Sequence, residues 1–539
     1  MTLSHTSKNR LALTAICLAA LMFGLEISSV PVILPTLERV LHSDFSEMQW
    51  IMNAYTLACT TVMMATGTLS DRFGRRRVFI IAIVAFGLTS LLCGLANGST
   101  MLIVGRRRVF IIAIVAFGLT SLLCGLANGS TMLIVGRFMQ GMAGGAMLIC
   151  QVAALSHQFE NGQQRGQAFG IWGVVFGIGL GFGPAIGGVI VAIANWQWVF
   201  LIHVVIAALT LLLVIFSVQE SRDPQAAKLD SPGIVTLSLS VFGLVYFITQ
   251  GAGFGFTSVR AGEILLAAAL SLLLFIGVER RSPYPMIEFS VFRNRQFSGA
   301  LMGSIGMNFS FWPFMIYLPL YFQIGLGYDS LTTGLSLLAY TLPTLVFPPL
   351  GERLALRYRP GAVIPSGLFA LGLGFLLMKS GSSGEHAGGL AMLPGLLIAG
   401  IGLGITNTPV TNTTTGSVSN ARAGMASGID MSARMIALAV NIAVMGFILL
   451  AGVDVYLRQT LPESFGTLPL RSVAEQIVAG NLTALKTLPE WDALAPLVHA
   501  ALTQSFGLVM LYGGLGAWAL AAASLMIFVP WKTAAALPR

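Results

Sequence analysis

The chain has 539 residues, of which 55% are hydrophobic and only 9% are charged. A soluble globular protein carries about 25% charged residues, whereas a mean hydropathy of +0.83 is typical of a membrane protein. The composition therefore excludes a soluble enzyme, a disordered chain and a disulfide scaffold. The net charge of +9 is expected from basic residues at cytoplasmic loops, not from a nucleic-acid surface.

Apolar stretches long enough to cross a membrane recur along the whole chain. A helical span needs about 20 mostly apolar residues, and the sequence predicts 14 spans. They lie near residues 11–35, 48–69, 78–97, 132–156, 167–192, 197–217, 232–252, 261–279, 298–322, 331–350, 361–379, 388–414, 424–451 and 505–530. The first stretch is too long for a cleaved signal, so we expect it to be retained. The cysteines lie in apolar stretches without zinc spacing, and no metal site is predicted.

One segment is repeated without change. Residues 74–106 recur at 105–137, with a period of 31 residues. Without the second copy, most basic residues fall on one side of the membrane, whereas a fifteenth span would turn later basic loops to the other side, against the positive-inside rule. We therefore expect an extra helix near 109–128 that is displaced or does not span. A native, an engineered and an erroneous origin of the copy all stay open.

Two polar segments separate the spans. Residues 219–230 form a short linker, and residues 452–504 form a loop on the outer side. The apolar spacing inside this loop predicts one or two amphipathic helices lying on the outer face.

The segment after the second span combines an acid with several bases. It contains Gly67, Asp71, Arg72, Gly74 and Arg75 in the order G-x-L-x-D-R-x-G-R-R. Such charges at helix ends can form a network that latches the inner side in one state. Basic residues that simply hold the loop in the cytoplasm are the alternative.

An arginine lies within the fourth apolar stretch. Arg137 is followed by Gln140 and Gly141. A membrane arginine costs roughly 2.5–3.5 kcal/mol on insertion scales, so we expect it to face a partner or a wet cavity. A side chain that extends to the membrane interface is the alternative reading.

The fifth span is rich in glycine and ends in G-P-x-x-G-G. Its pattern residues are Gly179, Gly183, Pro184, Gly187 and Gly188. Small residues at this spacing allow close helix contact, and the proline adds a bend. Ordinary helix packing explains the spacing physically.

These three patterns resemble motifs A, B and C of the major facilitator superfamily of secondary transporters. Motif C is typical of its antiporters, and the 14 spans are similar to its drug:proton antiporter branch. The resemblance covers essentially the whole chain outside the copy. In the first span Glu26 stands where that branch has aspartate, and its asparagine is missing.

The resemblance implies an all-α membrane fold with two six-helix bundles and an inserted two-helix hairpin. We expect residues 1–218 to form the first bundle, 219–297 the linker and hairpin, 298–530 the second bundle, and 531–539 a cytoplasmic tail.

Two acids lie deep in predicted spans, Glu26 and Asp430. Burial in apolar surroundings destabilises a charged carboxylate and favours its protonated form. With Arg137, these acids are the predicted proton-coupling residues. Because Arg434 lies at i+4 from Asp430, a fixed ion pair is the alternative there. Glu26 has the corresponding alternative of a structural contact. The predicted substrate cavity consists of Glu26, Asn53, Tyr55, Asp430 and Arg434.

The expected function is proton-driven export of lipophilic, cationic compounds across the cytoplasmic membrane of a bacterium. Both termini would lie in the cytoplasm, the partners would be the bilayer and a small-molecule substrate, and a periplasmic adaptor protein is left open. No ATP-binding motif, enzymatic activity or cofactor is expected, because the proton gradient supplies the energy. Export of one specific metabolite, such as a siderophore, a lipid or an anionic antibiotic, and a non-transporting membrane receptor remain as alternatives.

Overall fold

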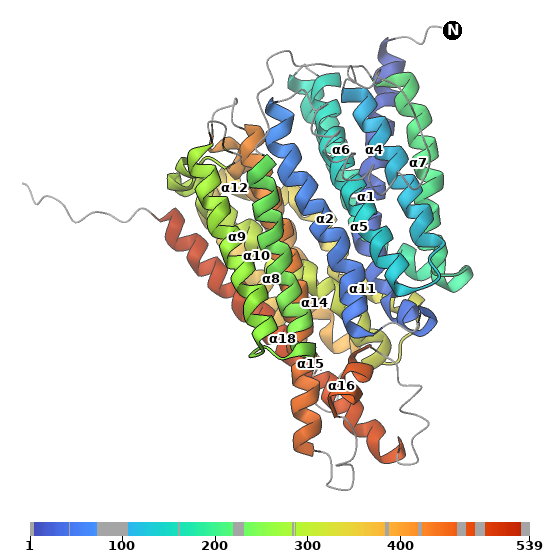
Figure 1. Cartoon of the computed structure of the whole chain (residues 1–539). Helices are drawn as coiled ribbons and strands as arrows, with labels where there is room; N and C mark the ends of the chain where they lie inside the picture. The colour runs from blue at the N-terminus through green and yellow to red at the C-terminus, as the bar shows by residue number, and fades with distance from the viewer. Residues whose placement is uncertain are drawn as a thin grey trace, which may run out of the picture.

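The computed structural model describes residues 5–41, 44–72, 106–159, 162–218, 231–282, 285, 287–382, 388–418, 423–460, 470–479 and 491–529. Among these residues the chain forms helices packed side by side, with no strand (Figure 1). The expected all-α membrane fold is confirmed. The domain boundaries stay a prediction.

The helices form two halves and a hairpin. The first half consists of α1 (His5–Leu41), α2 (Phe45–Arg72), α4 (Arg106–Gly125), α5 (Ser130–Gln158), α6 (Gly162–Ile193) and α7 (Gln197–Ser217). The second half consists of α10 (Arg295–Leu320), η4 (Tyr321–Gly325), α11 (Ser330–Val346), α12 (Pro348–Tyr358), α13 (Pro360–Ser382), α14 (Gly389–Gly416), α15 (Ala423–Thr460) and α18 (Trp491–Phe528). The hairpin of α8 (Ser231–Phe254) and α9 (Val259–Arg281) packs through α8 against α2 and α15, one helix from each half.

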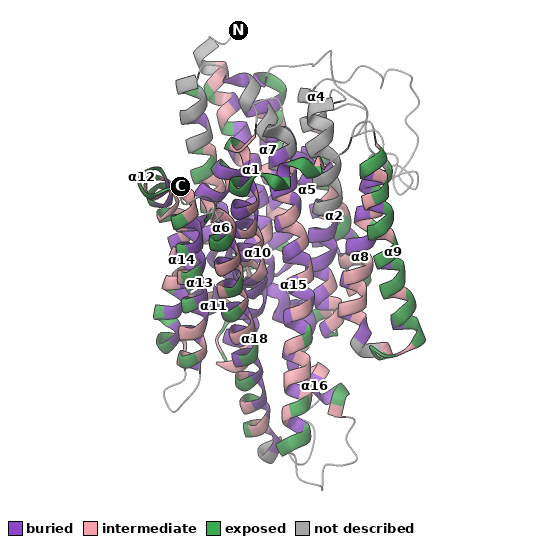
Figure 2. Cartoon of the chain, turned by 90° about the vertical axis from the view of Figure 1, so that its left-hand side faces the viewer, coloured by how far each residue is buried: buried purple, intermediate pink, exposed green. Residues whose placement is uncertain are grey.

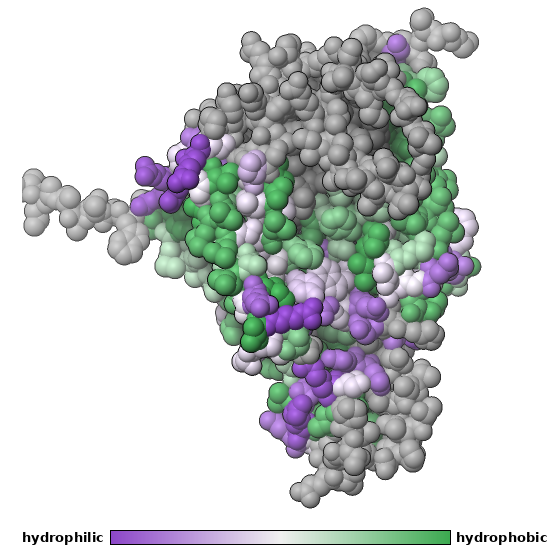
Figure 3. Space-filling model, viewed as in Figure 1, coloured by the Kyte–Doolittle hydropathy of each residue, from purple (hydrophilic) through white to green (hydrophobic). Residues whose placement is uncertain are grey.

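The surface of this helix assembly is that of a protein immersed in lipid. Within the described residues, nine helices are long and apolar enough to cross a membrane. Helix α9 exposes Leu266, Leu273 and Leu274, while the buried residues fill the interior of the helix assembly (Figure 2). Hydrophobic residues cover the middle of the visible face, and hydrophilic ones gather toward its ends (Figure 3). The chain is therefore a multi-pass membrane protein.

The second copy of the repeat does not form a displaced helix. Helix α4 comes from this copy and packs between α5 and α7, with Phe117, Ser121 and Cys124 fully buried. The displaced position was therefore wrong for residues 106–125, whereas the alternative of a helix that does not span stays a prediction. The two copies have the same sequence, so either could make these contacts. The second copy is the one whose end leads directly into α5. The predicted span 78–97 lies outside the described residues, and every other predicted span coincides with a helix.

The outer loop predicted at 452–504 is shorter than expected. Helix α15 continues to Thr460 and α18 already begins at Trp491, so both extend beyond the rest of the bundle (Figure 1). Between them lies α16 (Leu470–Ala479), whose Val473 and Ile477 join the hydrophobic core. The amphipathic helix expected in this loop is α16, which packs mainly against α15 and also contacts α2 and α18.

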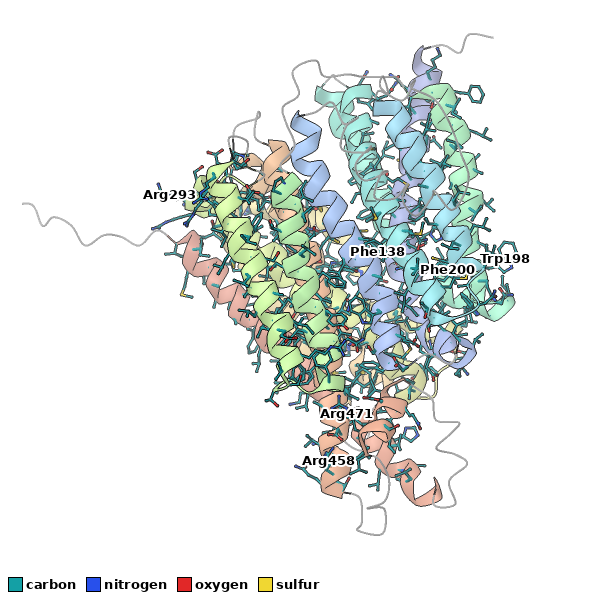
Figure 4. All side chains as sticks on the ribbon, in the orientation of Figure 1. Phe138, Trp198, Phe200, Arg293, Arg458 and Arg471 are labelled. Atoms are coloured by element: carbon teal, nitrogen blue, oxygen red, sulfur yellow. The ribbon has the colours of Figure 1, made fainter. Side chains whose placement is uncertain are left out.

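The two ends of the bundle are called here the α16 side and the opposite side. Arg458 and Arg471 lie on the α16 side, and Arg293 lies at the other end (Figure 4). The predicted span 331–350 is bent by 43° between α11 and α12. The bend falls where Pro348 and Pro349 lack the backbone donors that would continue α11.

Candidate functional site

A buried ion pair joins α1 to α5. Arg137 Nη1 donates to Glu26 Oε1, and both side chains are 0% exposed. Arg137 Nε donates to Ile51 O at 3.1 Å, and Nη1 also donates to Gln140 Oε1 at 2.7 Å. The guanidinium group is thus held by three helices, as a charged group in a membrane interior requires.

The second carboxylate oxygen of Glu26 faces α7. Glu26 Oε2 lies 3.4 Å from His203 Nδ1, which itself lies 3.0 Å from Val199 O. Two acceptors therefore compete for one ring nitrogen, and Glu26 Oε2 makes no hydrogen bond in this arrangement. Oε2 is therefore the oxygen at which a proton could bind while Oε1 still accepts from Arg137.

Neighbouring residues of motif B shape this site. Gln140 Nε2 donates to Ser121 Oγ of α4 at 2.7 Å, which fixes the amide oxygen toward Arg137. Gly141 lies directly against the backbone of Tyr55, where any Cβ would overlap the Tyr55 carbonyl group. The Arg137 guanidinium carbon lies 4.3 Å from the centre of the Tyr55 ring, within range of a cation–π contact. Phe200, 5.9 Å from the same carbon, points into the bundle, whereas Trp198 points out of it (Figure 4).

A narrow pocket lies between the two halves next to this ion pair. Its cavity volume is only about 20 Å³, so the halves are almost in contact here. The lining residues are Ile27 and Pro31 of α1, Met52, Tyr55 and Thr56 of α2, Arg137 of α5, Trp312, Met315 and Ile316 of α10, and Met435 and Leu438 of α15. Methionine side chains adapt to ligands of different shape, and aromatic rings offer a large apolar surface for stacking. Arg137 and not Glu26 is the charged residue at the wall, so the acid lies behind its partner.

The predicted cavity residues do not all line the pocket. Tyr55 lines the pocket. Asn53 does not, although it is fully buried and neither of its amide atoms has a hydrogen-bond partner. Asp430 and Arg434 also lie away from the pocket wall, and their neighbour Met435 takes that place.

Asp430 belongs to a separate polar network in the second half. Arg434 Nε and Nη2 lie 3.2 and 3.1 Å from Asp430 Oδ2, and Ser304 donates to Oδ1. Arg434 also donates to Asn407 Oδ1 at 2.7 Å and to Thr411 Oγ1 at 3.0 Å. Both carboxylate oxygens are therefore occupied, which favours the fixed ion pair that the i+4 spacing indicated.

The motif C glycines form the contacts of α6 with both halves. A Cβ on Gly179 would lie 2.8 Å from Leu21 O, and one on Gly187 would lie 2.9 Å from Ser29 O, both on α1. On the opposite face, Gly188 lies against Ser330, and Gly334 of α11 lies against the backbone of Pro184. Because Cβ atoms essentially never approach a backbone so closely, only glycine permits α6 to contact α1 and α11 at these positions.

Further contacts join the halves on the α16 side. Gln49 Nε2 of α2 donates to Tyr317 OH of α10 at 2.8 Å, and Gln323 Nε2 of η4 donates to Val32 O of α1 at 2.9 Å. Toward the opposite side, a Cβ on Gly173 of α6 would meet nothing within 4 Å. The halves are thus closed against each other on the α16 side. The sequence did not identify Gln49 or Gln323, because a lone glutamine near a helix end carries no pattern.

Motif A can be followed only in part. Gly67, Asp71 and Arg72 lie at the end of α2, where the structure describes the backbone and not the side chains. Gly74 and Arg75 lie outside the described residues. The latch on the opposite side stays a prediction. No group of side chains with metal-binding geometry occurs within the described part of the chain.

A comparison with known protein families agrees with the fold and the site described above. A family model described as Major Facilitator Superfamily matches residues 16–106 and 98–441, and the two matches overlap at the repeat. The chain belongs to the major facilitator superfamily, whose members are transporters.

Named relatives are drug exporters. Multidrug resistance protein Stp of Mycobacterium tuberculosis is 29% identical over 87% of this chain and 81% of its own length. The tetracenomycin C resistance and export protein of Streptomyces glaucescens is 27% identical over 96% and 90%. Multidrug efflux pump LfrA of Mycolicibacterium smegmatis is 23% identical over 89% and 88%.

Solved structures support the fold alone. A bacterial homologue of the human lysosomal transporter Spinster, described as inward-facing and unoccupied, has a TM-score of 0.56 at 14% identity. The alignment covers 98% of this chain and 99% of that one. The human organic anion transporter MFSD10 has a TM-score of 0.52 at 15% identity, with 94% and 99% covered.

Proposed function

We propose that this protein exports lipophilic compounds, cations among them, across a bacterial cytoplasmic membrane in exchange for protons. The observation that carries the proposal is the buried Glu26–Arg137 pair, whose arginine lines the pocket between the halves. Relatives named as multidrug and antibiotic exporters support the export direction. Each proton that moves inward supplies about 2.3 kcal/mol per 100 mV of membrane potential, so no cofactor is needed.

The proposed coupling step takes place at Glu26. While Arg137 is bound, the carboxylate is ionised and compensated. A proton that reaches Glu26 Oε2 from the His203 side would cancel the negative charge of the carboxylate. Arg137 would then keep only its hydrogen bonds to Ile51 O and Gln140 Oε1. An uncompensated buried charge is costly, so protonation drives Arg137 toward water or substrate in the pocket.

Substrate charge determines how Arg137 must move. A cationic substrate can reach Glu26 only if Arg137 leaves the wall of the pocket, because Arg137 stands between them. A neutral aromatic substrate needs no displacement of Arg137 and can stack on Tyr55 and Trp312 once the halves part. The cationic class expected from the sequence thus requires a displaced Arg137, and Asp430 has no access to the pocket in this state.

Export of one specific antibiotic is the second candidate. It is favoured by relatives named for single compounds, such as the tetracenomycin C exporter. Growth of an efflux-deficient strain that expresses the chain separates the two: resistance to several unrelated compounds supports multidrug export, and resistance to one supports the specific exporter. A chain that moves no compound at all would be the receptor alternative.

Transport in proteoliposomes tests the coupling. With an imposed pH gradient, the wild type should accumulate ethidium, and Glu26→Gln should lose at least tenfold of that uptake. Glu475→Gln, whose side chain is 42% exposed on α16, is the matched control and should retain it. Equal gradient-driven uptake by Glu26→Gln and the wild type would remove Glu26 from the proposal.

The orientation and partners follow from the same proposal. Both termini would lie in the cytoplasm, so the α16 side would face outward. Contact with a periplasmic adaptor protein stays a prediction, and photo-cross-linking from position 475 on α16 tests it.

A further inference from the structure

A second buried acid lies in α1, one turn before the helix ends. Glu38 is 0% exposed, and neither of its carboxylate oxygens has a hydrogen-bond partner. The coupling site does not use it, because Glu26 lies three turns away on another face of α1. A buried carboxylate without any donor is costly in its charged form and much less so when protonated.

The helical spacing shows where Glu38 points. Ile27, Pro31, Leu34 and Glu38 follow each other at intervals of four, three and four residues, which places them on one face of α1. Ile27 and Pro31 line the pocket between the halves, and Leu34 packs in the core that both halves share. Glu38 therefore lies on the face of α1 that is turned toward the second half, at the end closed on the α16 side.

The contacts that close the halves on the α16 side begin within two turns of Glu38 on α1, at Val32, and an exporter must open them. Gln323 of η4 binds α1 at Val32, and Gly188 and Gly334 join α6 to α11 on this side. Once these contacts part, water reaches the end of α1. A hydrated glutamate is ionised at neutral pH, and the halves cannot close over the charge without a desolvation cost.

We propose that Glu38 is a proton-binding site of the outer gate, and that the halves close on the α16 side when its carboxyl group is protonated. The inference rests on the proposed exchange cycle. The proton comes from water on the α16 side, binds one carboxylate oxygen, and returns to the same side when the gate opens. Glu38 therefore carries no proton across the membrane. When the outer side is acidic, its protonated form favours the return to the closed state seen here.

The ionisable groups close to Glu38 along α1, at the start of α2 and at the start of α11 have contacts of their own. Arg39 is exposed and donates from Nε to Pro35 O at 3.2 Å, although its charge acts on Glu38. Asp44 and Glu47 of the α2 start bind each other's backbone N–H groups. Thr332 holds the pKa of Asp329, which precedes α11, below its usual range, so Asp329 stays ionised at the pH values used below. Tyr321 of η4 is a buried phenol and stays neutral there.

Spin labels on both halves test the gate without substrate. We suggest labels at Ile193 of α6 and Leu390 of α14, which are 81% and 85% exposed on the α16 side. In lipid nanodiscs between pH 5.5 and 8.5, the wild-type ratio of open to closed distances should rise with pH, by up to about tenfold per unit for one proton. Glu38→Gln should stay closed, with a change below about twofold across the range.

Two further variants keep the result interpretable. Glu38→Asp retains a titrating carboxyl group and should keep the pH dependence, whereas Glu26→Gln should keep it even if proton-driven transport is lost. If the proposed role of Glu26 in proton coupling were wrong, this measurement would therefore still test Glu38. A wild type that does not respond to pH, or a Glu38→Gln protein that responds like the wild type, would overturn the proposal.

Discussion

Ser28 of α1 and Gly183 of α6 lie so close together that a methyl group on Gly183 would overlap the Ser28 hydroxyl group. The same hydroxyl group lies 3.0 Å from Gly179 O and 2.9 Å from Gly24 O. Helices α1 and α6 are therefore in backbone contact along the motif C segment. A movement of α6 that opens the α16 side must carry α1, and with it Glu26 and Glu38.

The close contact predicts the effect of the smallest substitution. Gly183→Ala displaces the Ser28 side chain and its hydrogen bond to Gly179 O, and should lower the free energy of unfolding by about 1–3 kcal/mol, as overpacking does. Gly173→Ala on the same helix is the control, because its Cβ would meet nothing within 4 Å. Thermal unfolding in detergent should separate the two variants by several degrees. Equal melting temperatures would contradict the contact.

The α6–α11 seam predicts a conformational effect. Gly334→Ala places a Cβ about 3.0 Å from Ala185 Cα of the other half, so the variant should favour opening on the α16 side. A cysteine introduced at Leu337, which is 0% exposed here, should then react several times faster with a membrane-impermeant maleimide. Gly262→Ala, whose Cβ would meet nothing within 4 Å, should leave the rate unchanged.

The Glu26–Arg137 pair predicts strong non-additivity. Removal of one partner leaves a buried, unpaired charge and should cost about 3–5 kcal/mol, whereas removal of both costs much less. Glu26→Gln and Arg137→Gln should each destabilise the protein, and the double variant should be more stable than the Arg137→Gln protein alone. Unfolding of all four proteins in one denaturant series measures the coupling. Additive effects would mean that the two side chains do not interact.

The Asp430 network predicts a structural role without proton coupling. Asp430→Asn should lower stability, because Arg434 loses its charged partner, yet pH-gradient-driven ethidium uptake should continue. Loss of that uptake in a folded Asp430→Asn protein would restore Asp430 as the proton carrier that the sequence predicted.

The repeat predicts that one copy is dispensable. Deletion of residues 74–104 leaves a single copy that still supplies the α4 residues Ser121 and Cys124, with motif A directly before it. The shortened protein should fold and transport like the full chain. A stable but inactive deletion protein would show that the first copy has a role of its own.

The sequence predicted the spans well because apolar length is a local property. Asp430 and Arg434 were likewise predictable as a pair, since four residues of one helix separate them. Glu26 and Arg137 are 111 residues apart, and nothing in the pattern of either helix indicates the other. Their chemistry was predictable, because both are charged groups in apolar spans, but their contact was not.

The wrong predictions have the same physical origin. Two identical segments have the same propensity to fill one position in the bundle, so the sequence could not tell which copy does. Glu38 was overlooked because one acid near the end of a span looks like an interfacial residue. Its burial depends on the second half of the chain.

Proton movement driven by substrate tests the central claim most directly. Proteoliposomes that contain a pH-sensitive dye are given an ethidium gradient and no pH gradient. The wild type should move protons against the direction of ethidium flow, whereas Glu26→Gln should exchange ethidium for ethidium and move no protons. Proton movement by Glu26→Gln, or ethidium transport by the wild type without protons, would contradict the account.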